Sequence, residues 1–150
     1  LDEIGGFDEA HFAYLEDIDI GYRADLYGYY NMYEPQAIVY HAGSATSGSR
    51  YNEFKIRLAA RNSVYLIYKN QTILQIIWHF FPLLAGFIIK QLFFIMKGYG
   101  KVYHKAVLEG LKQCKTKEMK AKRVGIVKGH FMDACRLEWE LWINILRKIM

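Results

Sequence analysis

The spacing of apolar positions divides the chain into a short helix, one strand and a long helical remainder. Over residues 18–26 apolar side chains recur every four positions, which predicts a short helix that ends before Gly28. Residues 37–41, AIVYH, are rich in β-branched and aromatic side chains, and they predict a strand that leads into a loop of small residues. A helix with one apolar side and one cationic side is expected over residues 54–70.

The most apolar stretch, residues 73–89, has a length that leaves three interpretations open. It is expected to be an interfacial or re-entrant segment, a true membrane span, or a soluble core helix. Extension to residue 96 gives twenty-four residues, enough to cross a bilayer. Lys90 and Gln91 would then be costly at membrane depth unless the segment is tilted or covered by protein.

A second amphipathic helix is expected within residues 126–150. Its apolar positions repeat at helical spacing, with tryptophans nearby: Leu137, Leu141, Ile145 and Ile149, with Trp139 and Trp142. Basic residues beside such a face suit an anionic membrane surface. The alternative is a helix that packs on its neighbour.

The charge is unevenly distributed along the 150 residues. Residues 1–50 contain nine Asp or Glu and two arginines, a net charge of −7, whereas residues 51–150 contain eighteen Lys or Arg and six acids, a net charge of +12. Cys114 and Cys135 are too far apart and too isolated to indicate a zinc site or a disulfide framework. The chain begins at Leu1 directly with a motif-dense segment, so we expect it to be part of a longer protein.

Three features of the first fifty residues have ordinary structural explanations when taken singly. Gly5 and Gly6 are adjacent glycines, which usually mark a turn. Glu16 and Asp17 fall at a helix start, where acids are favoured by the helix dipole. His41 lies at the end of the predicted strand, where a histidine is more often hydrogen-bonded than a ligand.

Their order and spacing indicate more than this. The stretch GGFDEAHFAYLEDIDIGYR, followed by GYYNMYEPQAIVYHAGSATS and later by Arg61-Asn62, resembles the carboxyl-terminal half of the catalytic domain of family 2 glycosyltransferases. The resemblance implies an α/β fold class. Residues 1–62 would be the acceptor-side part of an A-type nucleotide-sugar-binding domain, and residues 63–150 a mainly helical, membrane-associated tail with an apolar segment at 73–96.

The resemblance also implies roles for the acidic opening stretch. Asp17 would be the general base that removes a proton from the attacking sugar hydroxyl. Glu16 would position Asp17 or the acceptor. Asp8, together with Gly5 and Gly6, would bind the acceptor.

The donor side is implied in the same way. Arg61 would bind the donor phosphates, and His41 would contribute to a site for Mg or Mn, a divalent cation that neutralises the leaving nucleoside diphosphate. The Asp-x-Asp metal motif of the family has no plausible counterpart here. The letters DID at residues 17–19 lie in the region of the base, so they are rejected as that motif.

These expectations define an enzyme that moves a sugar from a nucleotide-sugar donor to a glycan or lipid-linked acceptor with inversion, for cell-surface polysaccharide or glycolipid synthesis. The chain lacks the Gln-x-x-Arg-Trp motif of processive synthases, so single additions are expected. The expected location is the cytoplasmic face of the cell membrane, on an anionic surface, with no nucleic-acid partner and a possible homo-oligomer. The alternative is a non-catalytic membrane-docking or interaction module.

Overall fold

The computed structural model describes residues 1–40 and 51–149, and in these ranges it consists of helices and loops. The first half contains a 3₁₀ turn and two helices: η1 (Glu9–His11), α1 (Glu16–Leu26) and α2 (Glu53–Asn70). The second half contains five more helices: α3 (Ile73–Trp78), α4 (Phe80–Met96), α5 (Gly100–Gln113), α6 (Lys117–Ala121) and α7 (Phe131–Ile149).

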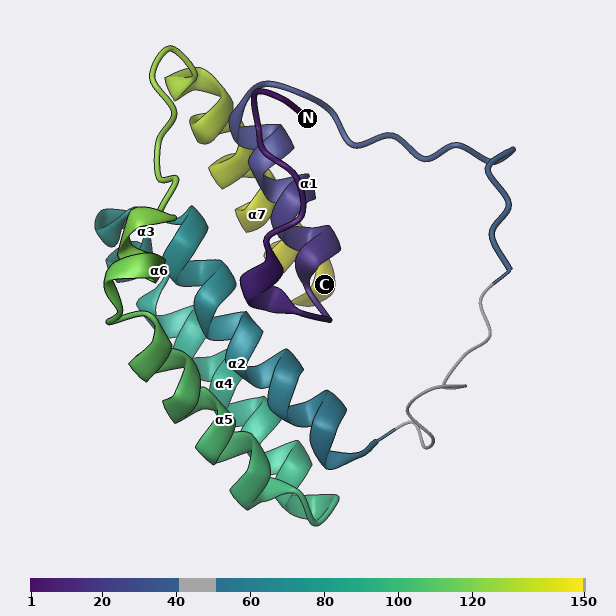
Figure 1. Cartoon of the computed structure of the whole chain (residues 1–150), viewed down its shortest axis with the longest axis vertical. Helices are drawn as coiled ribbons and strands as arrows, with labels where there is room; N and C mark the ends of the chain where they lie inside the picture. Colours follow the sequence, from purple (N-terminus) through teal and green to yellow (C-terminus); the bar gives the residue numbers. More distant parts are fainter. Residues whose placement is uncertain (41–50, 150) are drawn as a thin grey trace.

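Helices α2, α4 and α5 lie side by side and form the larger helical group (Figure 1). Its core contains Ile56, Ala60, Tyr103 and Ala106, all nearly inaccessible to solvent. The backbones of α2 and α5 approach closely at Gly110, because a Cβ atom there would lie 2.8 Å from the carbonyl oxygen of Arg61. Only glycine fits this contact without a shift of the two helices.

Helices α1 and α7 form a second group beside the first (Figure 1). Leu26 of α1 packs with Ala134 and Leu137 of α7. Helix α1 ends before Gly28, whose φ of +77° is the left-handed conformation that commonly follows a helix. The amphipathic segment expected within residues 126–150 thus contains a helix over residues 131–149, and one part of its apolar face packs on a neighbouring helix.

Local capping explains where the helices of the apolar segment begin and end. The Thr72 hydroxyl accepts a hydrogen bond from the Gln75 N–H at 3.2 Å, and the Gln75 side-chain oxygen accepts one from the Thr72 N–H at 2.8 Å, a capping box that starts α3. The helix is interrupted at His79, and Pro82 lies in the first turn of α4, where its missing N–H costs little. Within residues 1–40 and 51–149, no helix is both long enough and apolar enough to cross a membrane.

The predicted helices are present, but the predicted fold class is wrong. Helices over 16–26 and 53–70 match the expectations for residues 18–26 and 54–70. The described residues contain no strand, so an α/β fragment of an A-type domain is contradicted. Residues 37–40 are irregular and exposed, because a strand needs a neighbouring strand to satisfy its backbone and no extended partner lies beside them in the described ranges.

Two further expectations concern His41 and the boundary between residues 62 and 63. His41 lies outside the described residues. The expected boundary between residues 62 and 63 falls inside α2, which is continuous from Glu53 to Asn70.

Candidate active site

Asp17 and Glu16 lie in the first turn of α1, where the sequence predicts them. The Asp17 side chain is exposed, and one of its oxygens accepts a hydrogen bond from the Ile18 N–H at 2.9 Å. Glu16 is partly buried, and its Oε2 atom is buried without a hydrogen-bond partner among the described residues. The helix start therefore carries one carboxylate open to solvent and a second with an oxygen free to accept a proton donor.

The backbone that leads into α1 is held in an unusual conformation. Phe12, Tyr14 and Leu15 have φ values of 62°, 69° and 70°, which residues other than glycine rarely adopt. Each such residue costs on the order of 1–3 kcal/mol and persists only where neighbouring contacts enforce it. Strain of this kind concentrates at functional sites, so Glu16 and Asp17, which directly follow the strained residues, are candidates for such a site.

Arg61 and Asn62 of α2 supply the enforcing contacts. The Asn62 amide nitrogen lies 2.8 Å from the carbonyl oxygens of His11, Ala13 and Tyr14. The Arg61 guanidinium donates to the carbonyl oxygens of Ala10 and His11 at 3.2 and 3.1 Å. These two residues, the Arg61–Asn62 clamp, fix the loop that positions Asp17. Binding of donor phosphates by Arg61 stays a prediction.

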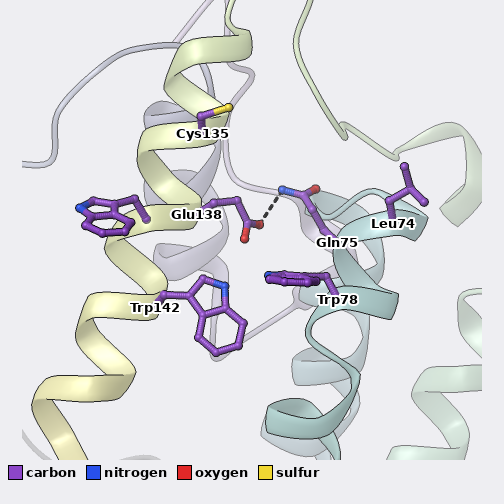
Figure 2. Close-up of a pocket in the computed structure, with 7 residues that line it drawn as sticks. Leu74, Gln75, Trp78, Cys135, Glu138 and Trp142 are labelled. Atoms are coloured by element: carbon purple, nitrogen blue, oxygen red, sulfur yellow. Dashed lines mark hydrogen bonds between the residues drawn. The ribbon is translucent and has the colours of Figure 1, made fainter.

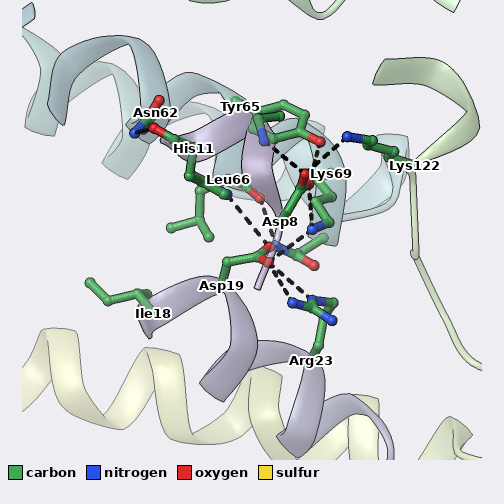
Figure 3. Close-up of polar contacts among 12 residues, drawn as sticks. Asp8, His11, Ile18, Asp19, Arg23, Asn62, Tyr65, Leu66, Lys69 and Lys122 are labelled. Atoms are coloured by element: carbon green, nitrogen blue, oxygen red, sulfur yellow. Dashed lines mark hydrogen bonds and ion pairs between the residues drawn. The ribbon is translucent and has the colours of Figure 1, made fainter. Parts of the chain in front are cut away.

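A buried charge network lies behind this loop, with Lys69 at its centre (Figure 3). The Lys69 ammonium contacts Asp8 Oδ2 and Asp19 Oδ2, each at 2.8 Å, and its side chain is only 6% exposed. The network is completed by donors from three parts of the chain: Tyr65 and Lys122 to Asp8 at 2.7 and 3.0 Å, and Asn70 and Arg23 to Asp19 at 2.7 and 2.8 Å. The acidic first third of the chain and the basic remainder are thus joined through this network.

Arg23 extends the network to the glycine loop. Besides its contact with Asp19, its guanidinium donates to the carbonyl oxygens of Ile4, Gly5 and Gly6. The carbonyls of the two glycines predicted to bind the acceptor therefore face Arg23. Asp8 is also engaged, since both of its oxygens accept hydrogen bonds within the protein.

The network determines the ionisation of its two acids. Burial by itself would raise the pKa of the Asp8 carboxyl, but hydrogen bonds from Lys69, Tyr65 and Lys122 outweigh it and hold the pKa well below its usual range. The pKa of Asp19 is lowered in the same way, with burial opposed by His11, Lys69 and Asn70. Both acids are therefore charged at neutral pH despite their burial.

This ionisation predicts acid sensitivity. A carboxylate whose pKa is lowered on folding stabilises the folded state at pH values above its pKa in the unfolded chain, which is 3.8 for Asp. This stabilisation decreases below pH 3.8 and is lost as the pH falls through the pKa of the carboxylate in the folded state. We expect the free energy of unfolding, measured with urea from pH 7 to pH 3, to drop by about 1 kcal/mol for each of the two acids by pH 3. Unchanged stability over that range would contradict the network.

The described residues contain one group of side chains with metal-ligating atoms close together, namely Asp8, His11 and Asp19. Its cation position is taken by the Lys69 ammonium, which bonds to both carboxylates. His11 Nε2 lies 3.8 Å from Asp19 Oδ1, and both side chains are fully buried. Mg or Mn does not fit here without displacement of Lys69. The predicted role of His41 concerns a residue outside the described ranges.

Most members of the network were not anticipated from the sequence. Asp19 stands in the DID letters next to Asp17, yet it is fully buried whereas Asp17 is exposed. The spacing of Asp19 and Arg23, one helical turn apart, is a signal that could have revealed their ion pair. Lys69 carries no such signal, because it reaches Asp19 across fifty positions of sequence.

Two curated proteins show partial similarity to this chain. Both are named N-acetylglucosaminyl-diphospho-decaprenol L-rhamnosyltransferase, from Mycobacterium tuberculosis strains CDC 1551 / Oshkosh and ATCC 25618 / H37Rv. Each is 41% identical over 46 residues, which is 31% of this chain and 15% of the relative. No family model and no solved structure matches. The partial relatives are glycosyltransferases by name, and the assignment to family 2 rests on the motifs alone.

Proposed function

We propose that this chain forms the acceptor-side catalytic part of an inverting family 2 glycosyltransferase. The enzyme would transfer a sugar from a nucleotide-sugar donor to a glycan or lipid-linked acceptor, in the synthesis of a cell-surface polysaccharide or glycolipid. Donor binding would depend on residues beyond these 150. The motif resemblance and the 46-residue similarity to rhamnosyltransferases support this proposal.

The observation that carries the proposal is the contrast between Asp17 and Asp19 on the same helix. Asp19 is fully buried and paired with Lys69 and Arg23, so its lone pairs are committed to the fold. Asp17 is exposed and, among the described residues, forms no ion pair. A general base must reach the hydroxyl whose proton it removes, and only Asp17 of these two acids can do so.

A groove near the start of α1 offers space for an acceptor, and Leu15 and Ile18, which flank Asp17 in sequence, belong to its lining whereas Asp17 itself does not. The groove, of about 310 Å³, lies between the start of α1, α2 and α4, with walls formed by Leu15, Ile18, Leu66, Ile67 and Phe87 among others. Ser63 and Lys90 are the polar side chains of its lining. In the proposed reaction, Asp17 takes the proton of an acceptor hydroxyl as its oxygen attacks the anomeric carbon, and the nucleoside diphosphate departs from the opposite face. Glu16, whose Oε2 atom is buried, would position Asp17.

Product stereochemistry tests the reaction class. The complete protein that carries these residues is incubated with nucleotide sugars and a lipid-linked acceptor, and the anomeric configuration of the product is determined by NMR. Inversion relative to the donor is expected. Transfer with retained configuration, or no transfer with any nucleotide sugar, would contradict the proposal.

The proposed location is the cytoplasmic face of the membrane, and the surface of α3 and α4 supports the membrane attachment that this location requires. Helix α4 contains no buried residue, and together with α3 it exposes a series of large apolar side chains: Ile73, Ile77, Phe80, Phe81, Leu84, Ile88, Ile89, Leu92, Ile95 and Met96. Exposed lysines lie at positions 90 and 97, within and directly after α4, and at position 101 beside Ile95. An apolar helix face flanked by lysines suits partial insertion into an anionic interface.

Liposome co-sedimentation tests this attachment. We expect the chain to need anionic lipid at low salt and to stay partly bound at high salt, because salt screens the lysine term and leaves the apolar term. The double substitution Phe81→Ser and Ile89→Ser should weaken binding by about tenfold or more at every salt concentration, since each removes a large apolar side chain.

The matched control is Met32→Ser, which changes an equally exposed apolar side chain in the loop after α1. Its binding should equal that of the unmodified chain. Equal sedimentation of the double variant and the control would refute attachment through α4.

A further inference from the structure

The chain contains three tryptophans, and all of them line one pocket between α3 and α7. Figure 2 shows Trp78 of α3 opposite Trp142 of α7, with Glu138 and Gln75 between the helices. The ring centroids of Trp78 and Trp142 are 6.0 Å apart and their planes meet at 72°. Leu74, Cys135 and Trp139 complete the lining of this open groove of about 650 Å³, which we call the tryptophan pocket.

The polar side of the tryptophan pocket is held rigidly. The Gln75 side-chain oxygen accepts from the Thr72 N–H at 2.8 Å, as part of the box that caps α3. Its amide nitrogen donates to Glu138 Oε1 at 2.8 Å, and His79 Nε2 lies 3.0 Å from Glu138 Oε2. A carboxylate has about four acceptor positions, so Glu138 keeps capacity for two further donors. The Gln75 amide likewise keeps one N–H to offer.

Core packing does not explain the tryptophans. Trp78 and Trp139 are 67% and 68% exposed, so most of their ring surface contacts water. Large apolar rings are usually buried unless a partner or ligand covers them. A pocket with apolar walls, a few fixed polar groups and this volume is typical of a small-molecule site.

The local charge distinguishes between possible occupants. Glu138 lines the pocket and is the charged side chain of its lining, so an anionic lipid headgroup at this position would be repelled. The Glu138 carboxylate can accept hydrogen bonds from hydroxyl groups, and the Gln75 amide can donate one. These groups beside aromatic rings suit a neutral sugar. The C–H face of a pyranose ring packs flat on an indole, and its hydroxyls reach outward to polar groups at the edge.

We infer that the tryptophan pocket binds a pyranose ring of a neutral glycan. The sugar stacks on the exposed face of Trp78 and donates hydroxyl hydrogen bonds to Glu138 while Gln75 donates to a sugar oxygen. In the glycosyltransferase proposed above, on which this assignment rests, the pocket holds a sugar of the acceptor glycan apart from the residues that perform transfer.

Tryptophan fluorescence tests the assignment directly. Because every tryptophan of the chain lines this pocket, tryptophan emission reports on it when the excitation wavelength is too long for the tyrosines to absorb. The chain is titrated with methyl N-acetyl-β-D-glucosaminide and with methyl α-L-rhamnoside up to about 100 mM, since one ring with few contacts is expected to bind in the millimolar range. At least one of the two sugars should give a saturable change in emission.

Variants locate the binding. Trp78→Ala should abolish the saturable response, and Glu138→Gln should weaken it about tenfold, because a hydrogen bond to a charged acceptor is lost. Saturation-transfer NMR of the sugar protons measures the same binding in Trp78→Ala, where fewer tryptophans report. The control Tyr33→Ala, an 88% exposed aromatic in the loop after α1, should bind as the unmodified chain does.

The outcomes separate this assignment from the proposed activity. No saturable response to either sugar, unchanged binding by Trp78→Ala, or an emission change caused only by anionic vesicles would overturn the sugar pocket while leaving transfer assays unaffected. Saturable sugar binding that depends on Trp78 and Glu138 would support it. Such binding in a complete protein that transfers no sugar would overturn the transferase proposal alone.

Discussion

Replacement of Asp17 by asparagine is expected to abolish sugar transfer by the complete protein while the fold is preserved. The amide keeps the size of the carboxylate, but it cannot take a proton from the acceptor hydroxyl. Loss of a general base typically lowers the rate by about 100- to 10,000-fold. The measurement is kcat for transfer from the nucleotide sugar, with donor affinity determined separately by calorimetry, and donor affinity should be nearly unchanged.

Glu9→Gln is the matched control for this experiment. Glu9 is an exposed acid in the same opening stretch, so the substitution removes the same charge by the same chemical change. Its rate should stay close to that of the unmodified protein. Asp17→Asn is also expected to unfold at the same urea concentration as the unmodified protein, because Asp17 is exposed and accepts only a local backbone hydrogen bond. A rate above about a tenth of the original would rule out Asp17 as the base.

The sequence predicted helices more reliably than strands, because a helix forms from neighbouring residues whereas a strand needs a partner segment from elsewhere in the chain. Residues 53–70 form the predicted helix because its periodic apolar positions lie within its own eighteen residues and its cap, Asn52, directly precedes them. Ile38, Val39 and Tyr40 have high strand propensity as well, but they are 72%, 85% and 95% exposed and form no strand. Strand formation requires pairing with another segment, which local composition cannot supply.

The candidate site shows the same limit at the level of single residues. The sequence placed Asp17 correctly at a helix start, because acids in the first turn and an apolar period are local signals. It could not distinguish the exposed Asp17 from the buried Asp19, since this difference depends on Lys69, fifty positions away in the chain. The tryptophan pocket was hidden for the same reason, because Trp78 and Trp142 lie on helices distant in sequence.

The buried network predicts the largest effect on stability. Lys69→Met removes the ammonium that bridges Asp8 and Asp19, and it leaves two buried carboxylates with fewer compensating partners. Removal of one partner from a buried ion pair typically costs about 3–5 kcal/mol, because the remaining charge is poorly solvated. We expect a loss of this size in the free energy of unfolding at pH 7, measured by urea denaturation.

The pH dependence of the same variant separates charge from packing. Lys69 is a main cause of the lowered pKa values of both acids, so these values should rise toward the ordinary range in Lys69→Met. Stability would then change less between pH 7 and pH 3 than it does in the unmodified chain, because smaller pKa differences on folding leave less to lose. Lys122→Met is the matched control: its side chain is 35% exposed, so its ion pair with Asp8 is worth only about 0–1 kcal/mol. Equal losses from the two substitutions would contradict this prediction, because they would mean that the charge between Asp8 and Asp19 contributes no more than the partly exposed pair of Lys122 and Asp8.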